Sequence, residues 1–223
     1  RLASISVIHK LNGHYLDTKH PIITENLLGI KRVKGTYQKA KKPILINDLK
    51  SIVNVINEEN NSKTKSKNKA LILVGFAGGF RRSELVSILY EDIEFVREGV
   101  KIFVKRSKTD QSGEGMTKGI PYFFNPEYCP VESLKNWVQE SQIKSGKIFD
   151  MSDKNVALTI KKYAALVGLD KNKYSGHSLR SGFATSTAEL GAEERSIMSM
   201  TGHKTTQMVR RYIKEANLFK NNA

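Results

Sequence analysis

The sequence is poor in cysteine and in acidic residues, and it has no long hydrophobic run. Its one cysteine cannot form an internal disulfide, and no cysteine and histidine cluster has the spacing of a zinc site. The longest apolar run, residues 70–80, holds three glycines and is too short to span a bilayer, and the N-terminus has no signal-peptide core. These absences argue against a disulfide-stapled secreted domain, a metal protein and a membrane protein. We therefore expect a cytoplasmic protein in a reducing compartment.

The scarcity of acidic residues leaves a large positive charge. The 223 residues include 37 Lys+Arg against 22 Asp+Glu, a formal net charge of +15. Such a surface carries a wide positive field, which favours a polyanionic partner. An RNA-binding protein would carry the same charge, but strands with aromatic residues that stack on bases are missing. With 39% hydrophobic residues the chain can also build a proper core, as one large domain or two small ones.

Hydrophobic periodicity predicts a mainly helical protein with one small three-stranded antiparallel sheet, an α+β fold. The predicted strands are residues 93–96, 100–105 and 119–123. Helices are predicted over residues 2–11, 21–33, 70–76, 83–89, 130–141, 155–167, 178–190, 192–200 and 206–219, and a further one begins at Asn47, capped by Asn47 or Asp48. The lysine-rich residues 61–69 are interpreted as a loop, and Gly78-Gly79 as a tight turn.

Four polar residues near the C-terminus suit the chemistry of a phosphodiester. His177 and Arg180 form an H-x-x-R motif, His203 follows a glycine, and Tyr212 comes nine residues after His203. Arginine presents a planar fork that matches two phosphate oxygens, and histidine donates or accepts a proton near neutral pH. A tyrosine hydroxyl can act as a covalent nucleophile.

Two further segments upstream add positive charge. Residues 79–85 read Gly-Phe-Arg-Arg-Ser-Glu-Leu, with Arg81 at the third position and Glu84 three residues later. Lys108 lies in Arg106-Ser107-Lys108-Thr109-Asp110, after a predicted strand. The order of the segments is therefore an arginine box, a lysine, a second arginine box and a tyrosine.

These segments, in this order, resemble the tyrosine recombinases, also called the phage integrase family. Residues 79–85 resemble the first arginine box, Lys108-Thr109 resembles the lysine of the β-hairpin, and the C-terminal four resemble the family's signature. The resemblance extends over roughly residues 43–223 and implies a tyrosine recombinase catalytic domain there. It also implies that residues 1–33 are the C-terminal part of the helical core-binding domain. The apolar pattern of the helix predicted over residues 21–33 places Ile23, Leu27, Leu28 and Ile30 facing inward.

Residues 34–42 are then expected to be a basic interdomain linker. Basic residues are dense at this junction and no acidic residue interrupts them. They are Lys31, Arg32, Lys34, Lys39, Lys41 and Lys42. We interpret them as phosphate contacts of a segment that crosses DNA, although a merely solvated, flexible connector would look the same.

The resemblance implies a site-specific DNA recombinase or integrase that cleaves and rejoins double-stranded DNA through a 3′-phosphotyrosyl intermediate, without metal, cofactor or ATP. Arg81 and Arg180 would bind the non-bridging phosphate oxygens, and His203 would donate a further hydrogen bond to them.

The remaining roles concern the nucleophile and the leaving group. Tyr212 would attack the phosphorus, and His177 would accept its proton. Lys108 would protonate the leaving 5′ oxygen, and Glu84 would support the site by hydrogen bonding.

Each position also has an ordinary structural interpretation. Arg81 is followed by Arg82, and one of the two could be only a surface charge. Glu84 could be an exposed ion-pair partner, and Lys108, near two other cations, could lie on a solvated strand edge. The motif context favours the functional interpretation for these positions.

The same choice applies at the C-terminus. His177 and His203 could be core or capping histidines, and Tyr212 lies in an apolar helical stripe where a tyrosine is normally core. The spacing of the boxes favours the functional interpretation. The stripe continues after Tyr212 with Ile213, Ala216, Leu218 and Phe219. We expect these residues to contact a neighbouring subunit of a homo-oligomer, a tetramer on DNA, with packing on their own domain as the alternative.

Other functions remain open at this point. Phage-type integrases, plasmid or chromosome-dimer resolvases and transposon-borne recombinases share these boxes, so the boxes do not separate them. A type IB topoisomerase uses the same residue types as a monomer. A non-catalytic DNA-binding protein is disfavoured because all six catalytic positions are occupied.

Overall fold

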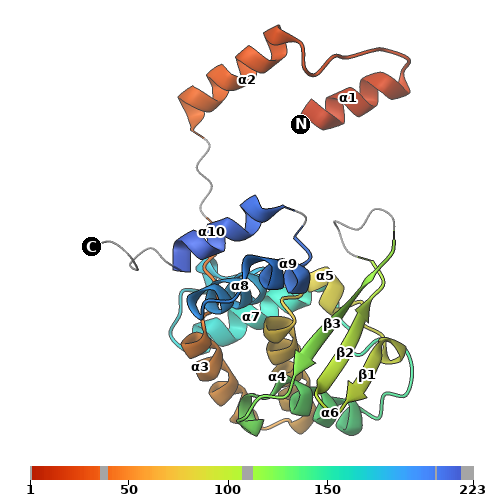
Figure 1. The fold of residues 1–223 in the computed structure, drawn as a ribbon, viewed down its shortest axis with the longest axis vertical. Helices are drawn as coiled ribbons and strands as arrows, with labels where there is room; N and C mark the ends of the chain where they lie inside the picture. The colour runs from red at the N-terminus through yellow and green to blue at the C-terminus, as the bar shows by residue number, and fades with distance from the viewer. Residues whose placement is uncertain (1, 36–39, 107–112, 204, 217–223) are drawn as a thin grey trace. The chain divides into compact units, whose positions relative to one another are not determined.

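The computed structural model describes residues 2–35, 40–106, 113–203 and 205–216 (Figure 1). The chain divides into two compact units, Arg1–Ala40 and Lys41–Ala223. The division lies within the segment expected to be a linker. The assignment of residues 1–33 to a core-binding domain stays a prediction.

The smaller unit contains α1 (Leu2–Leu11) and α2 (Pro21–Lys34). Helix α2 begins with Pro21, and Nδ1 of His20 accepts a hydrogen bond from the backbone N–H of Ile22 at 3.3 Å. Neither helix has a buried residue, and Leu28 and Ile30 are 50% and 54% exposed. The expectation that Leu28 and Ile30 face inward is therefore wrong, while Ile23 and Leu27 are half-buried. Two short helices offer too little surface to cover each other fully.

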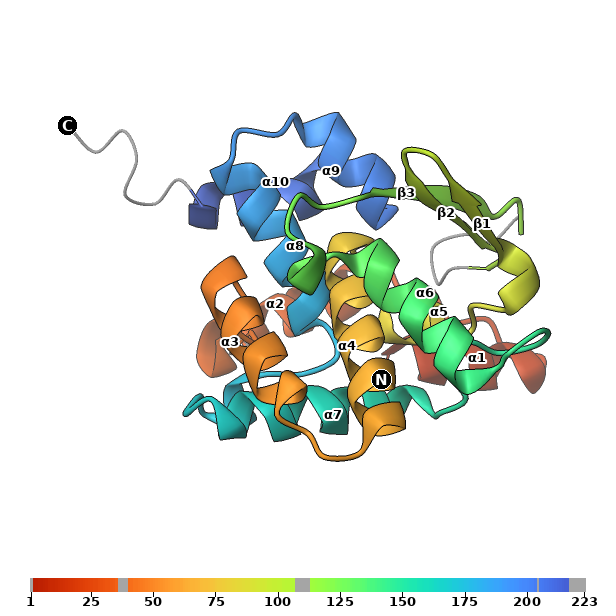
Figure 2. The same cartoon turned by 90° about the horizontal axis from the view of Figure 1, so that it is seen from below.

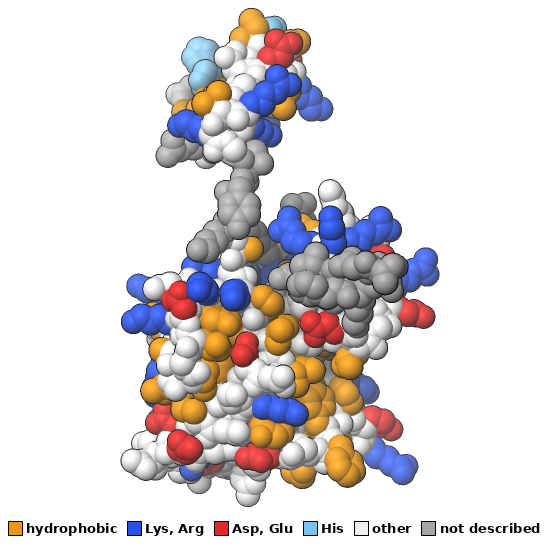
Figure 3. Space-filling view, turned by 90° about the vertical axis from the view of Figure 1, so that its left-hand side faces the viewer, with side chains coloured by type: hydrophobic (Ala, Val, Ile, Leu, Met, Phe, Trp, Pro, Cys, Tyr) orange, Lys and Arg blue, Asp and Glu red, His pale blue; other side chains and the backbone are white. Residues whose placement is uncertain are grey.

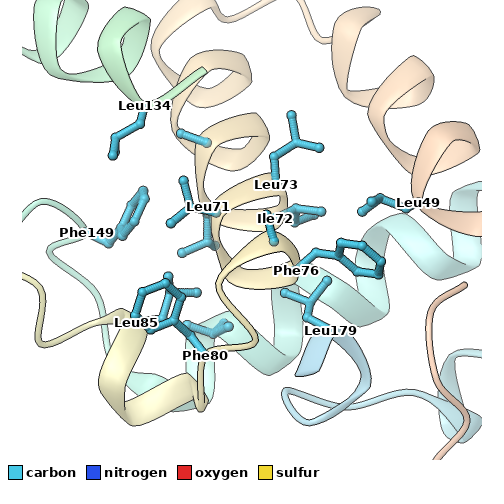
Figure 4. Close-up of a cluster of buried hydrophobic side chains, with 14 of the residues drawn as sticks. Leu49, Leu71, Ile72, Leu73, Phe76, Phe80, Leu85, Leu134, Phe149 and Leu179 are labelled. Carbon is cyan, nitrogen blue, oxygen red and sulfur yellow. The ribbon is translucent and has the colours of Figure 1, made fainter. Parts of the chain in front are cut away.

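The larger unit is built around α4 (Ser62–Ala77), which runs through its centre (Figure 2). Every residue from Ala70 to Ala77 is buried. Leu71, Ile72 and Phe76 belong to the hydrophobic cluster drawn in Figure 4. A helix that is apolar on all sides must be covered on all sides. The neighbours that cover it include α3 (Ile46–Asn57), α6 (Pro130–Ser141) and α8 (Ser178–Glu189), while α7 (Asp153–Leu166) packs on α3.

Several boundaries differ from the sequence-based expectation; the third strand, expected over residues 119–123, is Met116–Pro121. Residues 62–69 are the first turns of α4 and not a loop, because Asn61 caps the helix by accepting a hydrogen bond from the N–H of Thr64 at 2.8 Å and because lysine is a good helix former. Helix α3 begins at Ile46 without a side-chain cap, so the expected cap at Asn47 or Asp48 is wrong. Helix α5 is a single turn, Arg82–Leu85.

The sheet confirms the expected fold class. Its strands β1 (Ile93–Val96), β2 (Gly99–Val104) and β3 (Met116–Pro121) are antiparallel in the order β1-β2-β3. Val100 pairs with Ile120 and Ile102 with Lys118, and all four residues are buried. A lysine therefore occupies a core position of β3. The short 3-10 helices are η1 (Tyr90–Asp92), η2 (Pro126–Tyr128) and η3 (Lys171–Lys173).

Helices α8, α9 (Glu194–Thr201) and α10 (Thr206–Ala216) pack together at one end of this unit. Their contact forms a second, small core of four buried residues, Ala184, Ala188, Ile197 and Val209, with Tyr212 and Ile213 packed against it. Ile213 thus packs on its own domain. Leu218 and Phe219 lie outside the described residues.

Charge is unevenly distributed over the surface. On the face of the larger unit shown in Figure 3, Lys and Arg side chains are densest toward the end that carries α8, α9 and α10, while apolar and acidic side chains are mixed over the rest. No helix in the part of the chain that the structure describes is both long and apolar enough to cross a membrane.

Candidate active site

The site begins at the turn after α4. Gly79 has a φ of +54°, and a Cβ there would lie 2.9 Å from the Phe183 ring and 3.2 Å from the methyl group of Thr201. Only glycine adopts this conformation at so little cost in so little space. The turn places Arg81 at the start of α5, next to the core.

Arg81 and Glu84 form a closely bonded pair. Nη1 of Arg81 lies 2.5 Å from Oε1 of Glu84, and the backbone N–H of Arg81 donates to Oε2 at 3.0 Å. Nη2 of Arg81 also donates to the carbonyl of Gly202 at 3.4 Å. Glu84 is 2% exposed, so its interpretation as a surface ion-pair partner is wrong. Arg82 instead pairs with Asp153 at 3.0 Å on the surface.

Arg180 contributes a second, buried guanidinium. Its Nη1 donates to the carbonyl of Gly79 at 2.9 Å, while Nη2 is buried and has no hydrogen-bond partner among the described residues. Burial and then the charge of Arg81 lower the pKa of Arg180 to about 10, against the opposing effects of Glu84 and Tyr212. Arg180 therefore stays charged at neutral pH. A buried donor without a partner is costly, and an anion at this point would remove that cost.

Lys118 is a member of the site that the motifs do not include. Its Nζ donates to the carbonyl of Gly78 at 2.8 Å, lies 3.8 Å from Oε2 of Glu84 and sits 4.4 Å from the centroid of the Phe80 ring. Burial lowers its pKa to about 7, Glu84 opposes this, and Arg180 and Arg81 add to it. The sequence could have indicated Lys118 by its position two residues before the apolar Ile120, because alternate residues of a strand face the same side of the sheet.

His203 and Tyr212 lie next to each other. Their rings stack with centroids 6.0 Å apart and an interplanar angle of 30°. Nδ1 of His203 lies 2.8 Å from Oγ1 of Thr201. Burial first, and then the charges of Arg180, Arg81 and Lys118, lower the pKa of His203 to about 4. His203 is consequently neutral at pH 7.

His177 precedes α8, one turn before Arg180. It is exposed, so it is not a core histidine, and its side chain makes no capping hydrogen bond. Its backbone N–H donates to Oγ of Ser175 at 3.3 Å, and its carbonyl accepts from Oγ of Ser181 at 3.0 Å. Its role as acceptor of the Tyr212 proton stays a prediction.

Some predicted positions are not part of this geometry. Lys39 and Lys108 lie outside the described residues, so their roles stay predictions. Lys41 donates to the carbonyl of Asn172 at 2.5 Å, which holds the end of the expected linker against the larger unit. Lys31, Arg32, Lys34 and Lys42 are exposed. The described residues contain no group of three or more His, Cys, Asp or Glu side chains that could hold a metal ion.

The arrangement brings together Arg81, Glu84, Arg180, His203 and Tyr212, drawn from segments that are far apart in the sequence. Three buried or nearly buried cations share one carboxylate, Glu84. Such a site can bind an oxyanion and stabilise additional negative charge on it. The phenol of Tyr212 is the neighbouring group that can act as a nucleophile.

The chain is similar to known recombinases and integrases. The sequence profile described as "Phage integrase family" matches residues 44–218. A protein named "Integrase/recombinase xerD homolog" from Selenomonas ruminantium is 43% identical over 238 residues, which cover 100% of this chain and 69% of that protein. "Tyrosine recombinase XerD" from Haemophilus ducreyi is 29% identical over 148 residues, 64% of this chain and 49% of that protein. The chain thus spans about half the length of the latter relative.

The fold is also similar to that of a solved recombinase structure. The crystal structure of the XerH site-specific recombinase bound to a palindromic difH substrate, in a post-cleavage complex, superposes with a TM-score of 0.65 at 19% identity. The likeness covers 82% of this chain and 51% of that one, and it shows a common fold. Since the family profile matches most of the sequence, the chain belongs to the phage integrase family, the tyrosine recombinases.

Proposed function

We propose that this chain is the catalytic part of a site-specific recombinase or integrase that cleaves and rejoins double-stranded DNA through Tyr212. The observation that carries the proposal is the Arg180 guanidinium, buried and with Nη2 lacking a partner among the described residues, beside Arg81 and within electrostatic range of Tyr212. A DNA phosphate is the ligand whose charge and geometry satisfy such a pair of guanidinium groups.

The cations act before and during the reaction. Because they are largely buried, they attract a phosphate more strongly than exposed cations do, and they are already oriented when charge builds up on the non-bridging oxygens. Hydrogen bonds to the carbonyls of Gly79 and Gly202 and to Glu84 hold the guanidinium planes in place. Little reorganisation is then needed in the transition state.

The covalent step exchanges one phosphoester bond for another. Oη of Tyr212 forms a bond to phosphorus, its proton passes to a base, and the bond from phosphorus to the 5′ oxygen breaks as that oxygen gains a proton. His177 is the proposed base, and Lys108 is the proposed acid. Because the phosphotyrosyl bond retains the energy of the phosphodiester, a 5′-hydroxyl from another strand can reverse the step without ATP.

The proposed partners are double-stranded DNA and further copies of the chain. XerH, which shares the fold, was crystallised with its DNA substrate. The net charge of +15 supports a long polyanion. Recombination joins two sites, so a homo-oligomer, a tetramer on DNA, is the proposed assembly.

The test is capture of the covalent intermediate. The full protein is incubated with nicked duplexes tiled across the DNA that flanks its gene, so that the short cleaved piece diffuses away and the adduct persists on a denaturing gel. Tyr212→Phe should bind the same duplexes and form no adduct, because it lacks only the nucleophilic oxygen. Tyr90→Phe, a change at a surface tyrosine, should form adduct as the wild type does. Adduct in Tyr212→Phe would move the nucleophile elsewhere.

The same substrates distinguish the other candidate functions. Binding without adduct in the wild type would indicate a non-catalytic DNA-binding protein. Relaxation of a supercoiled plasmid that carries one site, without exchange between two sites, would indicate a topoisomerase. Exchange between two sites supports the recombinase.

The acid has its own test. A thiol leaving group needs little protonation because it is far more acidic than an alcohol. Lys108→Ala should therefore be severely slow on ordinary DNA and close to wild type on DNA with sulfur at the 5′-bridging position. Without rescue, Lys108 would have a binding role only.

A further inference from the structure

The side chain of Thr201, the last residue of α9, contacts both the helix backbone and the ring of His203. Its hydroxyl is 2.6 Å from the carbonyl oxygen of Ile197 and 2.8 Å from Nδ1 of His203, and the residue is fully buried. Neither the motifs nor the roles discussed above include it. The carbonyl oxygen of Met198 is a more distant partner of the hydroxyl, at 3.5 Å. These contacts determine where the proton of the histidine ring must be.

The hydroxyl has only one hydrogen, and a carbonyl oxygen has none. Two oxygen atoms 2.6 Å apart are held together only by a hydrogen between them, so the hydroxyl of Thr201 donates to Ile197. Toward His203 the hydroxyl can then only accept. Nδ1 of His203 must therefore carry a hydrogen, and in the neutral ring Nε2 carries none.

We infer that Thr201 is a positioning residue that holds His203 in the Nδ1–H tautomer, so that Nε2 is a hydrogen-bond acceptor before DNA binds. His203 can then donate to a phosphate oxygen, the role implied by the resemblance, only after Nε2 has gained a proton. This inference rests on the proposed function for the phosphate, but the tautomer itself does not depend on it.

The surrounding charges make this proton uptake depend on the ligand. The groups that act on His203 are Arg180 on α8, Arg81 before α5, Lys118 on β3 and Glu84 on α5. Tyr212 on α10 stacks on the ring. The three cations and burial lower the pKa of His203 to about 4, which keeps Nε2 bare at neutral pH.

A bound phosphate offsets these cations and raises the pKa of His203 again. Binding of the scissile phosphate and protonation of Nε2 are therefore coupled, and each favours the other. The imidazolium that results donates from both nitrogens, Nδ1 to Thr201 and Nε2 to the phosphate. Cleavage should accordingly become faster as the pH falls through the raised pKa of His203.

The first test is the ¹⁵N NMR spectrum of the full protein with labelled histidine, without DNA at pH 7. The His203 signals are identified by their loss in His203→Gln. Wild type should show a protonated Nδ1 and a bare Nε2. Thr201→Val keeps the shape of the side chain and removes the hydroxyl, so the tautomer ratio should shift at least about tenfold toward Nε2–H, a change of about 1.4 kcal/mol. Thr201→Ser should restore the wild-type spectrum.

Thr187→Val is the matched control, because the hydroxyl of Thr187 also donates to a main-chain carbonyl, that of Phe183 at 2.8 Å, on the neighbouring helix. It should leave the His203 signals unchanged. A wild-type His203 protonated on Nε2, or a Thr201→Val spectrum identical to wild type, overturns the inference. Neither result depends on whether Tyr212 forms an adduct, so failure here is distinct from failure of the proposed function.

The second test is the pH profile of adduct formation on the nicked duplexes. Wild type and Thr201→Ser should gain rate as the pH falls from 8 to 6. Thr201→Val can place a hydrogen on Nε2 without taking up a proton, so its profile should be at least about threefold flatter over the same range. Parallel profiles for wild type and Thr201→Val would overturn the coupling, even if Thr201→Val were slower at every pH.

Discussion

The two halves of the site are held in different ways. The cation half, with Arg81, Arg180, Lys118 and the carboxylate of Glu84, is anchored to the turn after α4 and lies against the large core of the domain. The tyrosine half rests on α9 and α10, whose shared core with α8 has four buried residues among those that the structure describes. Tyr212 itself is only partly buried.

This difference matches what each half must do. Charge stabilisation is effective when the cations do not have to reorganise as the reaction proceeds. In the proposed reaction Tyr212, in contrast, would have to approach the phosphorus and carry it in a covalent intermediate. Segments with few buried contacts open at a lower free energy than core helices do. We therefore expect the cation half to be rigid and α10 to open locally.

The largest effect should follow from removing the shared carboxylate. Glu84→Gln leaves three neighbouring cations without their buried counter-charge and should lower the free energy of unfolding by about 3–5 kcal/mol. Urea unfolding measures this. Glu94→Gln is the control, because the pair of Glu94 with Lys101 is exposed and should be worth less than about 1 kcal/mol. Equal losses in the two variants would show that the cation half is not held by its carboxylate.

The next effect concerns the rate of cleavage. Arg180→Ala and Arg81→Ala should each slow adduct formation by roughly 10²-fold or more, since each removes a preoriented charge from the transition state. Lysine at either position should restore little of the cleavage rate, because its ammonium group cannot bind two phosphate oxygens in the planar, bidentate geometry of a guanidinium. Arg82→Ala, which changes a surface cation, should stay near the wild-type rate. An alanine variant at Arg81 or Arg180 that cleaves normally would reassign that arginine to DNA binding.

A smaller effect should separate local from global stability. Val209 on α10 is fully buried, and Val209→Ala removes two methyl groups, worth about 0.8 kcal/mol each or about 1.6 kcal/mol in total. We expect amide exchange in α10 to accelerate by roughly tenfold while the urea midpoint of the domain stays constant. Val53→Ala in α3, also fully buried, should instead lower the midpoint. A lower midpoint in both variants would mean that α10 unfolds only with the whole domain.

The effect that is smallest within a single pH unit is a pH slope. Burial and the neighbouring arginines lower the pKa of Lys118 to about 7 in the folded protein, whereas the unfolded side chain has its ordinary value near 10.5. Between these values the unfolded state binds more protons, so stability rises with pH in this window. Lys118→Met should flatten the slope by at most about 1.4 kcal/mol per pH unit. The exposed Lys101→Met should not change it, and an unchanged slope in Lys118→Met would show that Lys118 is not the group responsible.

Short segments of the sequence were enough to predict several site residues and secondary-structure elements. Each of Arg81, His203 and Tyr212 lies in a short motif whose letters can be recognised without a structure. The three strands and the helix over residues 130–141 were confirmed as well, although β3 begins at Met116 and not at residue 119. Local chemistry misled at residues 62–69, where a run of lysines suggested a loop but Asn61 and the buried helix that follows make it the start of α4.

The sequence by itself determined the fold class, the order of the boxes and the family, because these depend on residue types and short spacings. Only the tertiary structure decided which polar groups share one environment. Lys118 and Gly78 are 40 residues apart, and Arg180 and Gly79 are 101 apart, yet each pair is joined by a hydrogen bond. Packing between such distant segments buries these groups and brings their charges close together. Electrostatic interactions depend on distance in space and not along the chain. The neutrality of His203 and the proton position that Thr201 imposes therefore depend on the tertiary structure.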